Sequence, residues 1–176
     1  MKFHATSLKD AVLIDLERRG DDRGFFARTF CVDEFSAHGL PTEFVQQNMS
    51  YSAAKGTIRG MHFQNAPHGE DKLIRCLRGA IVDIILDLRP DSPTFKKWEA
   101  FELNEENKRQ LLVPKGFAHG FQTVADHVEV TYLVSAKYTP AAESGVRWND
   151  PAFGINWPLE PTEMSDKDKI WPDYQG

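Results

Sequence analysis

Apolar and polar residues alternate with a period of two over much of this chain. In Ile81–Leu88 (IVDIILDL), one face of a strand would carry Val82, Ile84, Leu86 and Leu88, and the other would carry Ile81, Asp83, Ile85 and Asp87. In Val128–Val134 (VEVTYLV), the valines and Tyr132 share one face, opposite Glu129 and Thr131. Both stretches predict β-strands.

Turn-forming residues interrupt the apolar stretches at short intervals. Ala11–Leu16 ends at Arg19-Gly20-Asp21-Asp22, and Phe25–Phe30 is a short aromatic stretch. Only Val32–His38 and Glu105–Gln110 suggest helices, each of one or two turns. This spacing predicts an antiparallel all-β domain with a few short helices, closed or double-sheeted to protect its edges.

Composition indicates a globular chain. Its 176 residues are 41% hydrophobic and 27% charged, which suits one domain spanning residues 1–176. A net charge of −5 argues against nucleic-acid binding. The two cysteines, Cys31 and Cys76, are too few for a disulfide framework and fit a reducing compartment. With no signal-like or membrane-spanning apolar run, we expect a cytoplasmic protein that does not bind membranes.

Two glycine-punctuated segments carry histidines. In Gly56–Gln64 (GTIRGMHFQ), a regular strand would place His62 and Gln64 on one face with Ile58, and Arg59 on the other face with Met61 and Phe63. In Pro114–Phe121, Gly116 and Gly120 flank His119, which suggests that the backbone lies close to another group. A single histidine is more often a satisfied, half-buried residue than a functional one, at odds of about two to one.

The spacing of these segments resembles the two cupin motifs. The first is Gly56-x5-His62-x-Gln64, and the second is Pro114-x-Gly116-x2-His119-x3-Thr123. Metal-binding cupins use histidine where this chain has Gln64, and an amide oxygen is a poor replacement for an imidazole ligand. Glu70 or Asp71 could supply a carboxylate, but a metal-free cupin is the better interpretation.

A longer series of motifs resembles one family. In chain order these are RGFF (23–26), FVQQN (44–48), KGTIRGMHFQ (55–64), DKLIRCLRGAIVDIILDLR (71–89), SPTF (92–95), LLVPKGFAHGFQT (111–123), WNDP (148–151) and INWP (155–158). Together they are similar to the dTDP-4-dehydrorhamnose 3,5-epimerase family over nearly the whole chain. The resemblance implies a cupin-type antiparallel jelly-roll barrel that works as a homodimer without metal or cofactor.

The resemblance also implies catalytic roles. A 4-keto sugar has acidic hydrogens on carbons 3 and 5, and inverting each centre needs a base, an acid on the opposite face and a group that stabilises the enolate oxygen. The matching residues are His62 as base, Asp168 as its partner, Tyr132 as acid and Lys72 near the ketone oxygen. From the residues alone, Tyr132 could equally be a core aromatic and Lys72 and Asp168 solvated surface charges.

Ten further positions match substrate contacts of the family. The diphosphate needs cations and the base needs apolar or aromatic surfaces, while the sugar needs hydrogen-bonding groups. The expected binding residues are Arg23, Phe26, Arg28, Gln46, Gln47, Asn48, Arg59, His119, Glu143 and Lys167. Two of them depart from the usual pattern: Arg28 stands where the family often has Glu, and Gln47 replaces a common Asp. The segment 48–59 is also one residue longer than in well-known members.

Three hypotheses about the function are compatible with the sequence. The preferred substrate is dTDP-4-dehydro-6-deoxyglucose, inverted at carbons 3 and 5, and a near alternative inverts one carbon or acts on another sugar nucleotide. A metal-dependent cupin enzyme would instead contain a stoichiometric metal ion. A non-catalytic sugar-binding cupin would tolerate His62→Asn with full affinity. Near the C-terminus, Trp171 and Tyr174 suggest that the polar tail docks on the domain.

Overall fold

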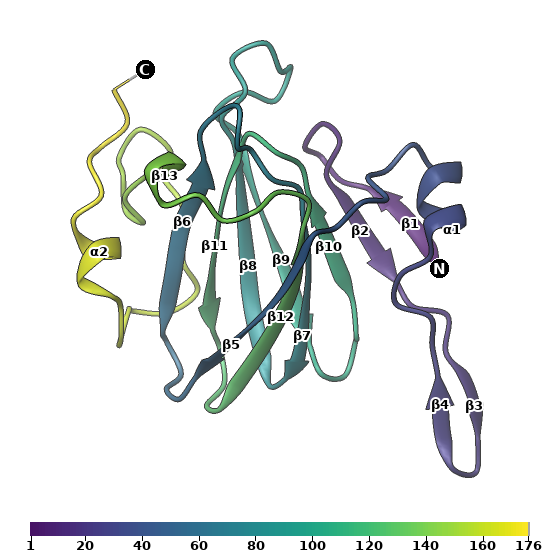
Figure 1. The fold of residues 1–176 in the computed structure, drawn as a ribbon. Helices are drawn as coiled ribbons and strands as arrows, with labels where there is room; N and C mark the ends of the chain where they lie inside the picture. The colour runs from purple at the N-terminus through teal and green to yellow at the C-terminus, as the bar shows by residue number, and fades with distance from the viewer. Residues whose placement is uncertain (176) are drawn as a thin grey trace.

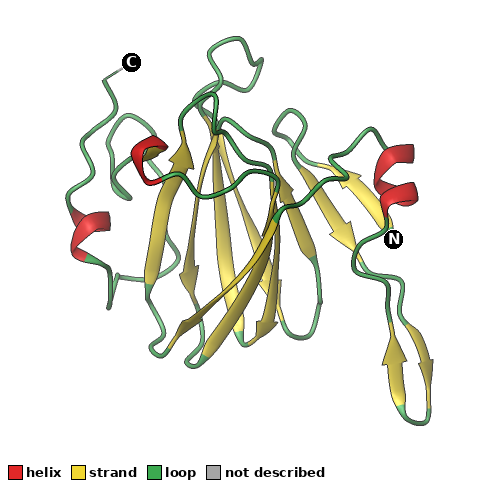
Figure 2. Cartoon of the chain, viewed as in Figure 1, coloured by secondary structure: helices red, strands yellow, loops and turns green. Residues whose placement is uncertain are grey.

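Two antiparallel sheets face each other in the computed structural model, which describes residues 1–175 (Figures 1 and 2). The larger sheet has the order β1 (Lys2–Ala5), β2 (Val12–Asp15), β10 (Gln110–Val113), β7 (Lys72–Arg78), β12 (Val128–Val134), β5 (Gln46–Ser52). The smaller sheet has the order β13 (Glu143–Gly145), β6 (Ile58–Gln64), β11 (Phe117–Thr123), β8 (Ala80–Asp87), β9 (Trp98–Asn104). The predicted all-β, double-sheeted architecture is confirmed.

The remaining elements are short. A separate hairpin of β3 (Arg19–Asp21) and β4 (Gly24–Phe26) projects away from both sheets in Figure 1. Helix α1 (Val32–Ala37) lies where a helix was predicted, and η1 (Pro140–Ala142) and α2 (Asp166–Lys169) are single turns. Within residues 1–175, no helix is both long and apolar enough to cross a bilayer.

The predicted helix at Glu105–Gln110 is wrong, because this segment is a turn leading into β10. The Asn104 Oδ1 atom accepts hydrogen bonds from the backbone N–H groups of Glu106 and Asn107. Lys108 adopts a φ of 55°, outside the right-handed helical region. Asparagine side chains that bond to nearby backbone compete with helix formation, and here they close a turn instead.

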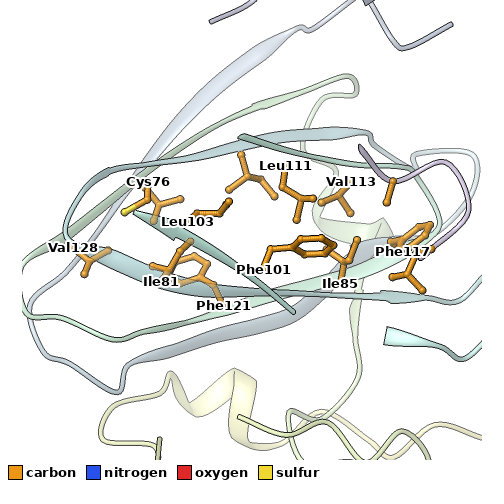
Figure 3. Packing of buried hydrophobic residues seen from close by; sticks show 14 residues of the cluster. Cys76, Ile81, Ile85, Phe101, Leu103, Leu111, Val113, Phe117, Phe121 and Val128 are labelled. Atoms are coloured by element: carbon orange, nitrogen blue, oxygen red, sulfur yellow. The ribbon is translucent and has the colours of Figure 1, made fainter. Parts of the chain in front are cut away.

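Apolar side chains from both sheets meet in the space between them (Figure 3). Ile81 and Ile85 of β8 point into this core, where they pack in one cluster with Phe101, Leu103 and Leu111. Each such side chain, fully buried, stabilises the fold by about 1.5–3 kcal/mol. The opposite face of β8 is also covered: Ile84 and Leu86 pack in a second cluster with residues of the C-terminal segment. Strand β8 therefore carries large apolar side chains on both faces because both faces are buried.

Strand β6 departs from the regular alternation expected from sequence. In its pairing with β11, His62 lies opposite His119 but Arg59 lies opposite Phe121, so three steps along β6 match two along β11. The additional residue is a β-bulge, which reverses the face of the residues before it. Arg59 was predicted on the face opposite His62, and this prediction is wrong: both side chains line the same cavity.

Two glycines make this bulge possible. Gly60 has a φ of 141°, and a Cβ atom there would lie 2.4 Å from the Cα atom of Gly120 on β11. A Cβ on Gly120 would in turn lie 2.7 Å from the Met61 sulfur. The expectation that the backbone around His119 lies close to another group is thus confirmed, and the group is β6 itself.

The C-terminal segment docks on the smaller sheet, as expected. Trp171 packs so tightly over Gly145 of β13 that a Cβ there would lie 2.5 Å from the indole ring. The Tyr174 backbone N–H donates a 2.6 Å hydrogen bond to Asp150. This segment brings α2 alongside β6 (Figure 1).

Candidate active site

A cavity of about 720 Å³ opens between the two sheets. Its walls come from β5, β7 and β12 of the larger sheet and from β6, β11 and β13 of the smaller one, with α2 closing one side. Most of the site residues expected from sequence line it, namely His62, Tyr132, Asp168, Lys72, Gln46, Asn48, Arg59, His119, Glu143 and Lys167. Residues from widely separated parts of the chain therefore share one hollow.

His62 and Asp168 form a hydrogen-bonded pair in this cavity. The Nε2 atom of His62 lies 2.5 Å from Oδ1 of Asp168, whose side chain is 5% exposed. Burial alone would raise the pKa of Asp168, but the hydrogen bond and charge of His62, with smaller contributions from the Gly60 N–H and the Ser165 hydroxyl, lower it overall. A carboxylate held ionised in this position orients the imidazole ring through the hydrogen bond.

Helix α2 is built to present Asp168. Ser165 caps the helix, and its Oγ atom accepts a hydrogen bond from the Asp168 backbone N–H at 3.1 Å. The Trp171 indole N–H, one turn further along, lies 3.4 Å from Asp168 Oδ1. The docked tail thus fixes the partner of His62.

Tyr132 enters the cavity from β12. Tyr132 is two residues from both Val130 and Val134, so all three side chains lie on the same face of β12 and point into the cavity, as the alternation predicts. Burial raises the pKa of Tyr132, the nearby Glu70 carboxylate adds to this increase, and the Arg59 guanidinium opposes it. The phenol is therefore protonated at neutral pH and can act as an acid.

Lys72 and Glu70 form an ion pair at the cavity wall. The Lys72 Nζ atom lies 3.3 Å from Glu70 Oε1, and the two side chains are only 12% and 13% exposed. The other Glu70 oxygen accepts a 3.2 Å hydrogen bond from the Gln64 amide. An ammonium group with little access to water is suited to stabilising a developing oxyanion.

A second histidine–carboxylate pair lies at the wall of the same cavity, which His119 lines and Asp83 does not. His119 Nε2 is 3.0 Å from Oδ2 of Asp83, a fully buried residue of β8. Asp83 was not among the expected site residues. The sequence does contain a clue to Asp83: the alternation of β8 places it on the same inward face as Ile81 and Ile85. A buried aspartate on that face needs a hydrogen-bonding or charged partner.

Three polar side chains meet at the cavity wall near α2. Lys167 forms an ion pair with Glu143, and the Tyr138 hydroxyl donates a 2.7 Å hydrogen bond to the same carboxylate. Burial alone would raise the pKa of Glu143, but these two partners lower it overall. Tyr138 was not expected from sequence, because it lies in a loop without periodic pattern.

The other expected binding residues do not line the cavity. Arg23 and Phe26 lie on the β3–β4 hairpin, where the Arg23 side chain is 90% exposed and pairs with Asp21. Arg28 follows the hairpin, and its Nη1 atom lies 3.4 Å from Oε1 of Glu34. Gln47 faces the other side of β5 and donates a hydrogen bond to Thr131. Substrate binding by these four residues stays a prediction.

Gln64 is not arranged as a metal ligand. Its amide nitrogen lies within hydrogen-bond distance of the His68 and Lys137 carbonyl oxygens and of Glu70, while its oxygen accepts from the Thr139 N–H. Across residues 1–175, no three histidine, cysteine, aspartate or glutamate side chains gather in a way that could hold a metal ion.

Fold and site together define a class of protein. A double-sheeted jelly roll whose interior holds a carboxylate-paired imidazole, a buried phenol and an ammonium group is a cupin-type fold equipped for proton transfer at carbon. Comparison with known proteins gives the family: residues 5–175 match the one described as dTDP-4-dehydrorhamnose 3,5-epimerase. The chain belongs to this family, which confirms the resemblance and the jelly-roll fold expected from sequence.

Individual members of this family match the chain over most of their length. The dTDP-4-dehydrorhamnose 3,5-epimerase of Sinorhizobium fredii is 43% identical over 173 residues, covering 98% of this chain and 89% of the relative. The crystal structure of the Bacillus anthracis enzyme, with TDP and PPi bound, is 48% identical, covers 98% of this chain and 99% of that one, and has a TM-score of 0.95. The Legionella pneumophila enzyme in complex with dTDP-4-keto-L-rhamnose is 34% identical, with 99% coverage of both chains and a TM-score of 0.89.

Proposed function

We propose that this protein converts dTDP-4-dehydro-6-deoxyglucose to dTDP-4-dehydrorhamnose by inverting carbons 3 and 5 through enolate intermediates. The observation that carries the proposal is the presence of the His62–Asp168 pair and the Tyr132 phenol in one cavity between the sheets. Membership of the epimerase family supports the same reading.

Each inversion follows from the chemistry of these groups. His62 removes the proton on carbon 3 or carbon 5, and the electron pair of the broken C–H bond moves into the C4 carbonyl to give an enolate. Lys72 donates a hydrogen bond to the oxygen that becomes negative. Tyr132 then gives its proton to the opposite face of the same carbon, and the two side chains regain their original protonation states by exchange with water.

The Asp168 carboxylate prepares His62 to accept a proton, and burial prepares Tyr132 to donate one. The Asp168 carboxylate stabilises the imidazolium that forms when His62 takes the proton. Burial keeps the Tyr132 phenol protonated until a strongly basic enolate carbon is close. One group is thus poised to accept a proton and the other to donate one.

The substrate class is also part of the proposal. A dTDP-sugar is supported by the relatives crystallised with TDP or with a dTDP-linked keto sugar. Arg59 and Lys167 supply cations at the cavity for the diphosphate, while Gln46, Asn48, His119 and Glu143 supply hydrogen-bonding groups. Because Cys31 and Cys76 are both free thiols, which suits a reducing compartment, we propose that the protein works in the cytoplasm.

We further propose that a second copy of the single cupin-like domain completes the site. Arg23 and Phe26 project on a hairpin directed away from their own cavity, and Phe26 is 66% exposed (Figure 1). These residues could contact a substrate only in a neighbouring subunit. A homodimer in which hairpins are exchanged would give a stacking aromatic and up to two more cations, Arg23 and Arg28, to each cavity.

The experiment is incubation with the 4-keto sugar nucleotide in deuterated water, followed by NMR at the two carbons. Deuterium at both carbons is the expected result, and deuterium at one would restrict the enzyme to a single-carbon epimerase. No label above the level of a His62→Asn control would overturn the proposal. Sedimentation analysis tests the dimer, and unchanged affinity in Arg28→Ala would remove that residue from the binding set.

A further inference from the structure

The Glu70 carboxylate lies in the cavity but has no task in the proton transfers described above. It stands in the loop just before β7, and its two oxygens are directed to different groups that line the cavity: one to the Lys72 ammonium and one to the Gln64 amide. A carboxylate that is only 13% exposed is costly to keep charged unless such partners hold it.

The ion pair fixes a group that would otherwise be free to move. A lysine side chain is a compact charge on a flexible four-carbon stem, and its position depends on its partners. Within residues 1–175, Glu70 is the one carboxylate found within ion-pair distance of Lys72. The ammonium has three N–H donors, so the contact with Glu70 leaves others available for an oxyanion.

Glu70 and Tyr132 line the same cavity, so the charge of Glu70 also acts on the phenol. Among the charged neighbours of the phenol, the Glu70 carboxylate raises the pKa of Tyr132, whereas the Arg59 guanidinium lowers it. The other titratable or charged side chains that line the same cavity are His62, Lys72, His119, Tyr138, Glu143, Glu163, Lys167 and Asp168. Neutralising Glu70 would remove the charge that opposes the effect of Arg59 on the pKa of Tyr132, while the effect of burial would remain.

We propose that Glu70 is a positioning residue, which orients the Lys72 ammonium and holds a negative charge in the cavity that Tyr132 lines. The role of Lys72 in this inference rests on the proposed function, whereas the effect on Tyr132 does not. Both effects come from one side chain because Lys72 and Tyr132 lie on neighbouring strands, with Tyr132 paired to Ile74 of β7.

The test compares Glu70→Gln with a matched control, Asp71→Asn. Both substitutions remove one negative charge and keep the side-chain shape, but the Asp71 oxygens bond to Ser135 and the Lys115 N–H, and Asp71 does not line the cavity. The readouts are kcat and KM for deuterium incorporation and the titration of Tyr132 by NMR of ¹³Cζ-labelled tyrosine. The chain has only four tyrosines, so Tyr132→Phe assigns the signal.

In Glu70→Gln we expect kcat to fall by roughly 10-fold to 100-fold, because the oxyanion donor is no longer held in place, while KM changes little. The midpoint of the Tyr132 titration moves to lower pH, and the control leaves both readouts unchanged. An unchanged Tyr132 titration, with or without a loss of activity, overturns the proposal. If the wild type incorporates no deuterium, the proposed function fails. The titration of Tyr132 still tests whether the Glu70 charge acts on the phenol.

Discussion

The Oδ1 atom of Asp168 lies 2.5 Å from Nε2 of His62, although 106 residues separate the two in the chain. A docked C-terminal tail supplies Asp168, and the bulged strand β6 supplies His62. The proposed proton transfer by His62 therefore depends on how the tail packs.

Replacing Asp168 by asparagine should remove the charge that stabilises the His62 imidazolium while keeping the side-chain shape. We expect kcat to fall by roughly 10³-fold, within the range that a positioned acid–base group contributes. Steady-state kinetics measures the loss. An activity within a factor of three of the wild type would show that His62 does not depend on this carboxylate.

Tyr132→Phe should separate proton removal from inversion. His62 can still take a proton and return one to the same face, so deuterium should enter the substrate without a change of configuration. We expect formation of the inverted product to fall by roughly 10²-fold or more, with substantial deuterium exchange retained. NMR of recovered substrate and product measures both. Equal losses of exchange and inversion would contradict the assignment of Tyr132 as the acid on the opposite face.

Asp83→Asn should act through His119 alone. The buried carboxylate fixes the imidazole ring, so its loss should raise KM by about tenfold, as for other partners that orient a histidine. The same substitution in a His119→Asn background should add almost nothing, because residues that share one interaction are not additive. Additive effects would mean that Asp83 serves the fold rather than the site.

Gly145→Ala should displace the C-terminal tail, and so affect Asp168, although Gly145 itself is not one of the proposed catalytic residues. The new methyl group would meet the Trp171 ring at 2.5 Å and the Met61 carbonyl oxygen at 2.7 Å, so Trp171 must move and Asp168 with it. We expect a loss of about 1–3 kcal/mol in unfolding free energy and a larger proportional loss of kcat. Ile170→Ala, at a 78% exposed position of the same segment, is the control and should change neither.

Asp87 should stabilise the fold in a pH-dependent way. Burial alone would raise the pKa of Asp87, but hydrogen bonds from Arg89, Ser92 and Thr94 lower it to about 2, from 3.8 for an unperturbed aspartate. Because the folded-state pKa is the lower one, this stabilisation is fully present above about pH 4 and is lost as the pH falls towards 2.

The measurement is urea unfolding of the wild type and Asp87→Asn at neutral and acidic pH. Removing the charge from this buried pair should cost about 3 kcal/mol at pH 7, and the difference between the two proteins should shrink below pH 4. A difference that stays constant down to pH 2.5 would show that the Asp87 charge is not the cause.

Local sequence signals predicted strands β8 and β12 correctly, whereas several of the shorter and edge strands carried no signal that was recognised. The alternation in Ile81–Leu88 and Val128–Val134 gave β8 and β12, and it placed Tyr132 among inward-facing residues because the period of a strand is a property of the backbone. The same reasoning failed at Glu105–Gln110, where asparagine side chains close a turn. Motif resemblance named the proposed catalytic residues, but it did not show how they are arranged in space.

What the sequence determined by itself is the set of chemical groups and the strands that carry them, since both are encoded within a few residues. What only the tertiary structure decided is which of those groups meet. The bulge at Gly60 brings Arg59 to the side of His62, the packed tail delivers Asp168, and the pairing of β8 with β11 sets Asp83 under His119. Each of these contacts joins segments distant in the chain, and close packing between sheets, rather than any local preference, selects them.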